Sequence, residues 1–113
     1  MARFRIMYWK EIPVQLQAED ESGQVSRPLD DRFQEGLDAI SMFDGSSGTD
    51  AYLEGFQWGP YTDSEGSAQE VAEAVAERFT SGFPRDFVAR IRDLQVSGKR
   101  DLNPGAIDHW VDS

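Results

Sequence analysis

The most chemically promising stretch of the chain is a run of four consecutive residues near its start: Tyr8, Trp9, Lys10 and Glu11. Two large amphipathic rings beside an opposite-charge pair suit a shallow binding surface at the end of a strand. The alternative is architectural. Tyr8 alternates with Ile6 and would then belong to the core, while Trp9, on the opposite face of the strand, would cover a helix. The sequence leaves both interpretations open.

Three further residues could extend this surface: Arg32, Gln34 and Trp58. Arg32 and Gln34 flank Phe33 on a predicted helix, so Phe33 can face the core while its neighbours point sideways toward the Trp9 region. An arginine near exposed carboxylates is more often part of a surface ion pair than a substrate clamp. Trp58 is interpreted first as part of an aromatic strand face and second as part of a binding groove.

No residue pattern points to a catalytic, cofactor or metal site. Cysteine is absent, which excludes disulfides, thiolate metal sites and cysteine nucleophiles, and His109 is the single histidine. The run from Asp44 to Asp50 lacks both the Gly-Lys-Ser/Thr ending of a phosphate loop and the ligand order of an EF-hand. We therefore expect no cofactor and no metal, and the sequence favours a protein without catalytic activity while leaving an enzyme open.

The charge of the chain limits its partners. Its 113 residues include 21 acidic and 11 basic side chains, a net charge of -10 that repels nucleic acid and anionic membranes. The first residues are too charged for a signal peptide, and no apolar run is long enough to span a bilayer. We therefore expect a cytoplasmic protein whose partner is another protein, with a homo-oligomer left open.

Local patterns predict the elements that must position these residues. Alternation of apolar and polar side chains predicts a β-hairpin over residues 3–18, and a short third strand follows over 24–27. A helix capped by Asp30 or Asp31 and ended by Gly45 is indicated by apolar residues at helical spacing: Phe33, Leu37 and Ile40. Residues 51–58 are predicted to form an aromatic strand, in which Gly55 marks a bulge or a close backbone approach.

The second half of the chain is predicted to be mainly helical. Ser67 and Glu70 form a capping box that starts a helix ending near Gly82, and a further helix is favoured over 85–96. Apolar residues of the tail, over 97–113, recur at near-helical spacing. The resulting fold class is α+β, with a small, mainly antiparallel sheet covered on one face by two or three helices.

The chain resembles the bacterial "virulence factor" domain family. The resemblance rests on the string from Tyr8 to Leu16 (YWKEIPVQL), on Arg32-Phe33-Gln34, and on the string from Tyr52 to Trp58 (YLEGFQW). It implies a family domain over 1–83, with 84–113 as a C-terminal helical extension and tail packed on or beside it. The family supplies no reaction, cofactor or catalytic residue.

Two functional hypotheses follow from the resemblance and the residues together. The first is a non-catalytic accessory or protein-interaction module. The alternative is a small ligand-binding or enzymatic subunit, which the resemblance connects with corrinoid- or folate-linked methyl transfer. A concave site in which Tyr8, Glu11 and Arg32 converge would favour the ligand, and a flat patch with Trp9 exposed would favour the partner.

Overall fold

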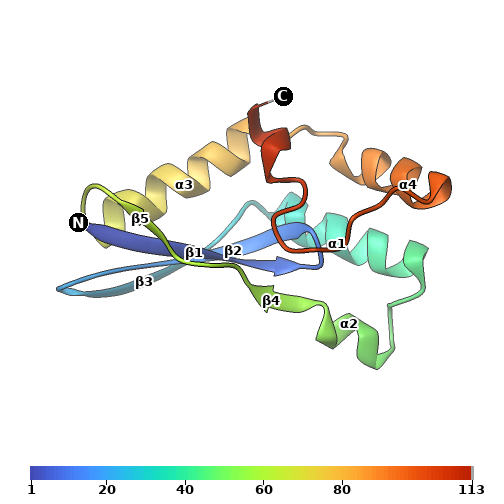
Figure 1. Cartoon of the computed structure of the whole chain (residues 1–113), viewed down its shortest axis with the longest axis horizontal. Helices are drawn as coiled ribbons and strands as arrows, with labels where there is room; N and C mark the ends of the chain where they lie inside the picture. Colours follow the sequence, from blue (N-terminus) through green and yellow to red (C-terminus); the bar gives the residue numbers. More distant parts are fainter. Residues whose placement is uncertain (113) are drawn as a thin grey trace.

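The computed structural model describes residues 1–112 and contains a five-stranded antiparallel sheet with its helices mainly on one side (Figure 1). The strands are β1 (Ala2–Trp9), β2 (Ile12–Asp20), β3 (Gly23–Pro28), β4 (Phe56–Trp58) and β5 (Thr62–Ser64). Their order is β3-β2-β1-β4, and β5 also pairs with β1, beyond β4 along the same edge. The predicted α+β class is confirmed.

The β1–β2 hairpin has a two-residue turn and one irregularity in register. Trp9 pairs with Ile12, which leaves Lys10 and Glu11 as the turn. Among the non-glycine residues of 1–112 only Lys10 has a positive φ, 52°, a conformation that is uncommon for residues with a side chain. Register shifts between Met7 and Tyr8, so Val14 of β2 has no partner opposite it.

Helix α1 (Asp31–Asp44) begins and ends where the sequence predicts. The Asp30 side chain accepts a hydrogen bond from the backbone of Arg32, and Gly45 ends the helix with φ 85°. Helix α3 (Ala68–Gly82) starts at the predicted capping box of Ser67 and Glu70. α3 packs across β1, β2 and β3, and α1 packs against β2 and α4 (Phe87–Ser97).

The prediction of one strand over 51–58 is wrong. Residues Asp50–Glu54 form a short helix, α2, and only Phe56–Trp58 are extended as β4. Tyr52 and Phe56 are four residues apart, which is the spacing of side chains on one face of a helix as well as on one face of a strand. Their ring centroids lie 5.7 Å apart across the α2–β4 junction. Between β4 and α3, residues Thr62–Ser64 form β5, which no predicted element covered and which extends the sheet along β1.

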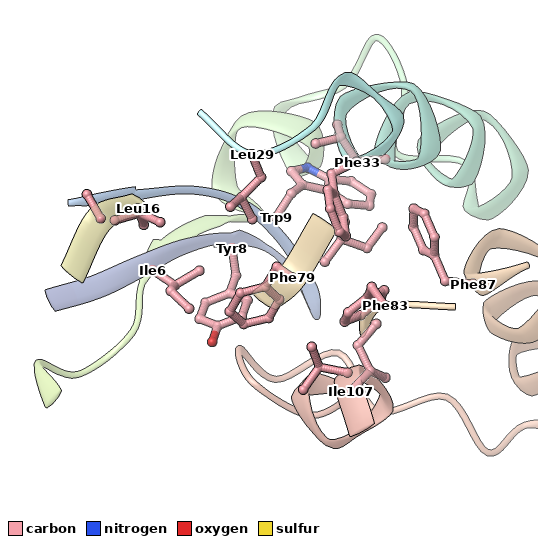
Figure 2. Packing of buried hydrophobic residues seen from close by; sticks show 14 of the residues in the cluster. Ile6, Tyr8, Trp9, Leu16, Leu29, Phe33, Phe79, Phe83, Phe87 and Ile107 are labelled. Atoms are coloured by element: carbon pink, nitrogen blue, oxygen red, sulfur yellow. The ribbon is translucent and has the colours of Figure 1, made fainter. Parts of the chain in front are cut away.

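The C-terminal segment completes the core. After α4 the chain turns back over the sheet and ends beside α3 in the 3₁₀-helix η1 (Asp108–Asp112) (Figure 1). Ile107 and Val111 are buried in the same cluster as Tyr8, Phe79 and Phe83 (Figure 2). None of the helices within residues 1–112 combines the length and apolar character needed to cross a bilayer.

Candidate functional site

A pocket lies between the sheet and the C-terminal segment, and Tyr8 forms part of its wall. Its volume is about 380 Å³, and its lining comes from β1, the 59–62 segment, α3 and the tail. The apolar part of the lining consists mainly of Phe4, Ile6, Val75, Phe79 and Val111. Polar groups come from Tyr8, Thr62, Arg78 and Asp108. Pockets of this size and mixed lining are typical of small-molecule sites.

The centre of the polar part is a hydrogen bond from the Tyr8 hydroxyl to Asp108 Oδ2, 2.5 Å long. The other carboxylate oxygen, Oδ1, is buried and is the one buried side-chain nitrogen or oxygen atom within residues 1–112 that has no hydrogen-bond partner. Gly59 allows the chain to pass close to the tyrosine ring, because a Cβ at this position would lie 2.9 Å from Tyr8 Cε2. The site is therefore built by residues about 100 positions apart in sequence.

Burial controls the ionisation of both groups. It raises the pKa of Tyr8 far above the ordinary tyrosine value, and the adjacent Asp108 raises it further. It also raises the pKa of Asp108, although the hydrogen bond from Tyr8 and the positive charges of Arg78 and His109 act in the opposite direction. A tyrosine in this state stays protonated, so Tyr8 acts as a hydrogen-bond donor and not as a base.

Glu11 and Lys10 belong to a second cluster, which is separate from the pocket. Glu11 is 1% exposed and forms two hydrogen bonds with the Arg100 guanidinium, of 2.7 and 2.8 Å. Arg100 also contacts Asp44 at 2.9 Å, and Lys10 Nζ contacts the same Asp44 oxygen at 2.7 Å and Ser46 Oγ at 2.7 Å. Two cations and two carboxylates thus neutralise one another inside the protein.

Asp44 shows the electrostatic consequence. Burial alone would raise the pKa of Asp44, but hydrogen bonds from Lys10, Ser46 and Arg100 outweigh it and hold the pKa at about 2. Every charged group of the cluster has an opposite-charge partner, so the cluster fixes the tail to the hairpin turn and to the end of α1. Within residues 1–112 no group of three or more acidic or histidine side chains is arranged to hold a metal ion.

Trp9 and Glu11 are buried, so they do not contribute to the shallow binding surface for which the sequence made them candidates. Trp9 is fully buried, donates from Nε1 to the Tyr52 carbonyl at 2.8 Å, and packs on the Tyr52 ring at 5.9 Å. Gly55 is a close backbone approach, as predicted, since a Cβ there would lie 2.7 Å from the Trp9 indole nitrogen. Trp9 and Glu11 are buried because the short helix α2 and the tail, neither of which the sequence patterns predicted there, lie over them.

Arg32 and Gln34 belong neither to the pocket nor to the buried charge cluster of Lys10, Glu11, Asp44 and Arg100. The Arg32 guanidinium donates to backbone carbonyls at the end of α3, Thr80 at 2.7 Å and Phe83 at 3.0 Å among them. Arg32 therefore supplies donors to the carbonyl groups of the last turn of α3, a turn that has no basic residue of its own. The expected surface ion pair of Arg32 is not formed within residues 1–112. Gln34 is exposed and bonds Asp38 at 3.3 Å. Tyr8, Glu11 and Arg32 do not converge.

Trp58 lies on the sheet face opposite the pocket and is partly exposed. The Arg5 guanidinium carbon lies 4.2 Å from the centroid of the Trp58 ring and 4.8 Å from that of Tyr61. The Arg3 guanidinium carbon lies 4.1 Å from the centroid of the same Tyr61 ring. Of the seven residues proposed from the sequence, only Tyr8 lines the pocket described above. Sequence reasoning missed Arg78 of α3, for which no local signal exists. It also missed Arg100 and Asp108 of the tail, where the one signal was that polar residues stand between apolar ones.

A family model described as "Virulence factor" matches residues 7–91 of the 113. The chain belongs to the virulence factor family. The resemblance found in the sequence is confirmed, and the matched segment includes Tyr8, Glu11 and the first part of α4. Arg100 and Asp108, the partners of Glu11 and Tyr8, lie beyond it.

The division of the chain at residue 83 stays a prediction. A search of curated proteins and a search of solved structures each found no significant match.

Proposed function

We propose that this member of the virulence factor family binds a small molecule in the pocket beside Tyr8 and carries out no chemistry on it. The observation that supports this proposal most directly is the buried Asp108 oxygen that lacks a donor from residues 1–112 in the wall of a cavity of mixed polar and apolar lining. Buried polar atoms are normally paired, and an unpaired one in a pocket is a place where a ligand group fits.

The groups present suit recognition better than catalysis. Tyr8 is held protonated and already donates to Asp108, and no nucleophile with an adjacent base lines the pocket. His109 is exposed and is not part of the lining. A partly apolar enclosure whose polar groups are Tyr8, Thr62, Arg78 and Asp108 is the pattern of a site that orients a ligand.

The test is a ligand screen read by NMR, with a variant that fills the cavity. Val75 lines the pocket from α3 and is half-buried, so Val75→Met should occupy the space that a ligand needs. Ala74→Met, at the neighbouring exposed position, is the matched control. We expect ligands to shift the Ile6 and Val111 methyl resonances of the native protein and of the control but not of Val75→Met. A screen of several hundred metabolites that leaves those methyl groups unshifted would reject the proposal.

A second candidate, the accessory role through protein contact, is favoured by the sheet face that carries Arg3, Arg5, Trp58 and Tyr61. In a chain of net charge -10 this face combines two aromatic rings with Arg5 and with Arg3, which also pairs with Glu19 of β2. Such a surface is complementary to an acidic segment of another protein. Titration with a glutamate-rich peptide should give binding that weakens with salt and is lost in Arg5→Gln with Trp58→Ala. Equal binding by native protein and variant would remove this candidate.

A further inference from the structure

The wall of the pocket contains an acceptor that is only half used. Asp108 Oδ2 receives the Tyr8 hydroxyl, while Oδ1 is shielded from solvent and receives no donor from residues 1–112. An ionised carboxylate offers acceptors only, so a ligand group that satisfies it must carry N–H or O–H. Charge-assisted bonds to a carboxylate are stronger than neutral ones, which favours a donor that is itself positively charged.

The charges around the pocket point the same way. Burial raises the pKa of Asp108, while the positive charges of Arg78 from α3 and of the neighbouring His109 act in the opposite direction. A bound cation would add to these charges in favouring the ionised carboxylate. Arg78 is solvent-exposed, so its charge is screened by water, whereas Asp108 Oδ1 is buried. The protein as a whole is strongly acidic and attracts small cations. A ligand anion would instead meet an already buried negative group.

We infer that the pocket takes a small primary amine with an apolar body, its ammonium group on Asp108 and its hydrocarbon part against Ile6 and Phe79. This inference rests on the proposed function and adds the chemical class of the ligand. The apolar walls come from β1 and α3, and Figure 2 shows Ile6 and Phe79 beside the Tyr8 ring. Burial of the hydrocarbon part supplies affinity, and the carboxylate selects the charged head.

Three probes that share a 3-methylbutyl body and differ in their polar group test the inference: 3-methylbutylamine, 3-methylbutan-1-ol and 4-methylpentanoate. Each is titrated into the full chain while the Ile6, Val75 and Val111 methyl resonances are followed. Asp108→Asn keeps the shape of the side chain and an acceptor for Tyr8 but removes the charge. Asp93→Asn, at an exposed position on α4, is the matched control.

We expect the amine to bind at least tenfold more tightly than the alcohol or the carboxylate. Asp108→Asn should weaken amine binding by at least tenfold and change alcohol binding by less than twofold, and Asp93→Asn should change neither. Alcohol binding by Asp108→Asn also shows that this variant keeps its fold and its pocket.

Two results would overturn the inference, and they are distinguishable. If the alcohol or the carboxylate binds as tightly as the amine, or if Asp108→Asn retains amine affinity, the pocket binds ligands of another class and the proposed function stands. If none of the three probes shifts the methyl resonances at millimolar concentration, the inference fails, and the metabolite screen described above then decides the proposed function separately.

Discussion

Replacing Arg100 by methionine is the sharpest test of the buried charge cluster. The side chain is 3% exposed and makes three hydrogen bonds of 2.7, 2.8 and 2.9 Å to Glu11 and Asp44. Asp44 keeps Lys10 in the variant, but Glu11, whose side chain is 1% exposed, loses its only cation within residues 1–112. Removing one partner of a buried pair typically costs about 3–5 kcal/mol, because the remaining charge is buried without compensation.

The size of this loss can be converted to a melting shift. Unfolding entropy is about 2.1 cal/mol/K per residue, which is about 0.24 kcal/mol/K for 113 residues. The expected loss in Arg100→Met therefore corresponds to a fall in Tm of about 12–20 °C. Urea unfolding followed by the fluorescence of buried Trp9 measures the same quantity as a free energy.

Two further variants make the result specific to the ion pair. Arg92→Met, an exposed arginine on α4, should change stability by less than about 0.5 kcal/mol. Glu11→Leu combined with Arg100→Met removes both members of the pair, and this double variant should be more stable than Arg100→Met alone. A loss under about 1 kcal/mol in Arg100→Met, or strict additivity in the double variant, would refute the claim that the cluster is buried and coupled.

Three other predictions concern single contacts. Folding lowers the pKa of Asp44 from 3.8 to about 2, so its ionised carboxylate adds about 2 kcal/mol to the free energy of unfolding above pH 4. This stabilisation is lost as pH falls toward 2, and acid unfolding of Asp44→Asn should lack the corresponding pH dependence. In Gly55→Ala the new Cβ lies 2.7 Å from Trp9 Nε1, so urea unfolding should show a loss of about 1–3 kcal/mol and near-UV circular dichroism a changed tryptophan signal; an unchanged signal contradicts the close approach. Asp108→Ala leaves the Tyr8 hydroxyl without its acceptor and should lower the free energy of unfolding by about 1–3 kcal/mol at pH 7. Asp108→Asn keeps an acceptor and should cost less than half as much. Equal losses in the two variants would mean that the stability does not depend on this hydrogen bond.

The parts of the fold that could be predicted are those with local physical causes. The Asp30 cap, the Ser67–Glu70 capping box and the Gly45 stop depend on residues within a few positions of each other, and all three form as expected. The α2–β4 segment was mispredicted because five helical residues followed by three extended ones are too short for either period to dominate.

The candidate site could be predicted only in part, because its polar pairs join distant segments. Tyr8 was identified from its own chemistry, but Asp108 lies 100 residues away and Arg100 lies 89 residues from Glu11. Nothing in the local pattern distinguishes these two residues from other polar residues of the tail. The same distance explains the error over exposure, since Glu11 is exposed in an isolated hairpin and is buried only once Arg100 lies against it.

The long sequence separation of the Glu11–Arg100 and Tyr8–Asp108 pairs also determines when these contacts can form during synthesis. A ribosome adds about 5–20 residues per second, so Arg100 and Asp108 are synthesised about 5–20 s after Glu11 and Tyr8. During that interval the hairpin can pair, but its turn has a carboxylate that only water can satisfy. The nascent chain must therefore keep this end of the sheet hydrated, and the buried charge cluster closes as one of the last steps of folding.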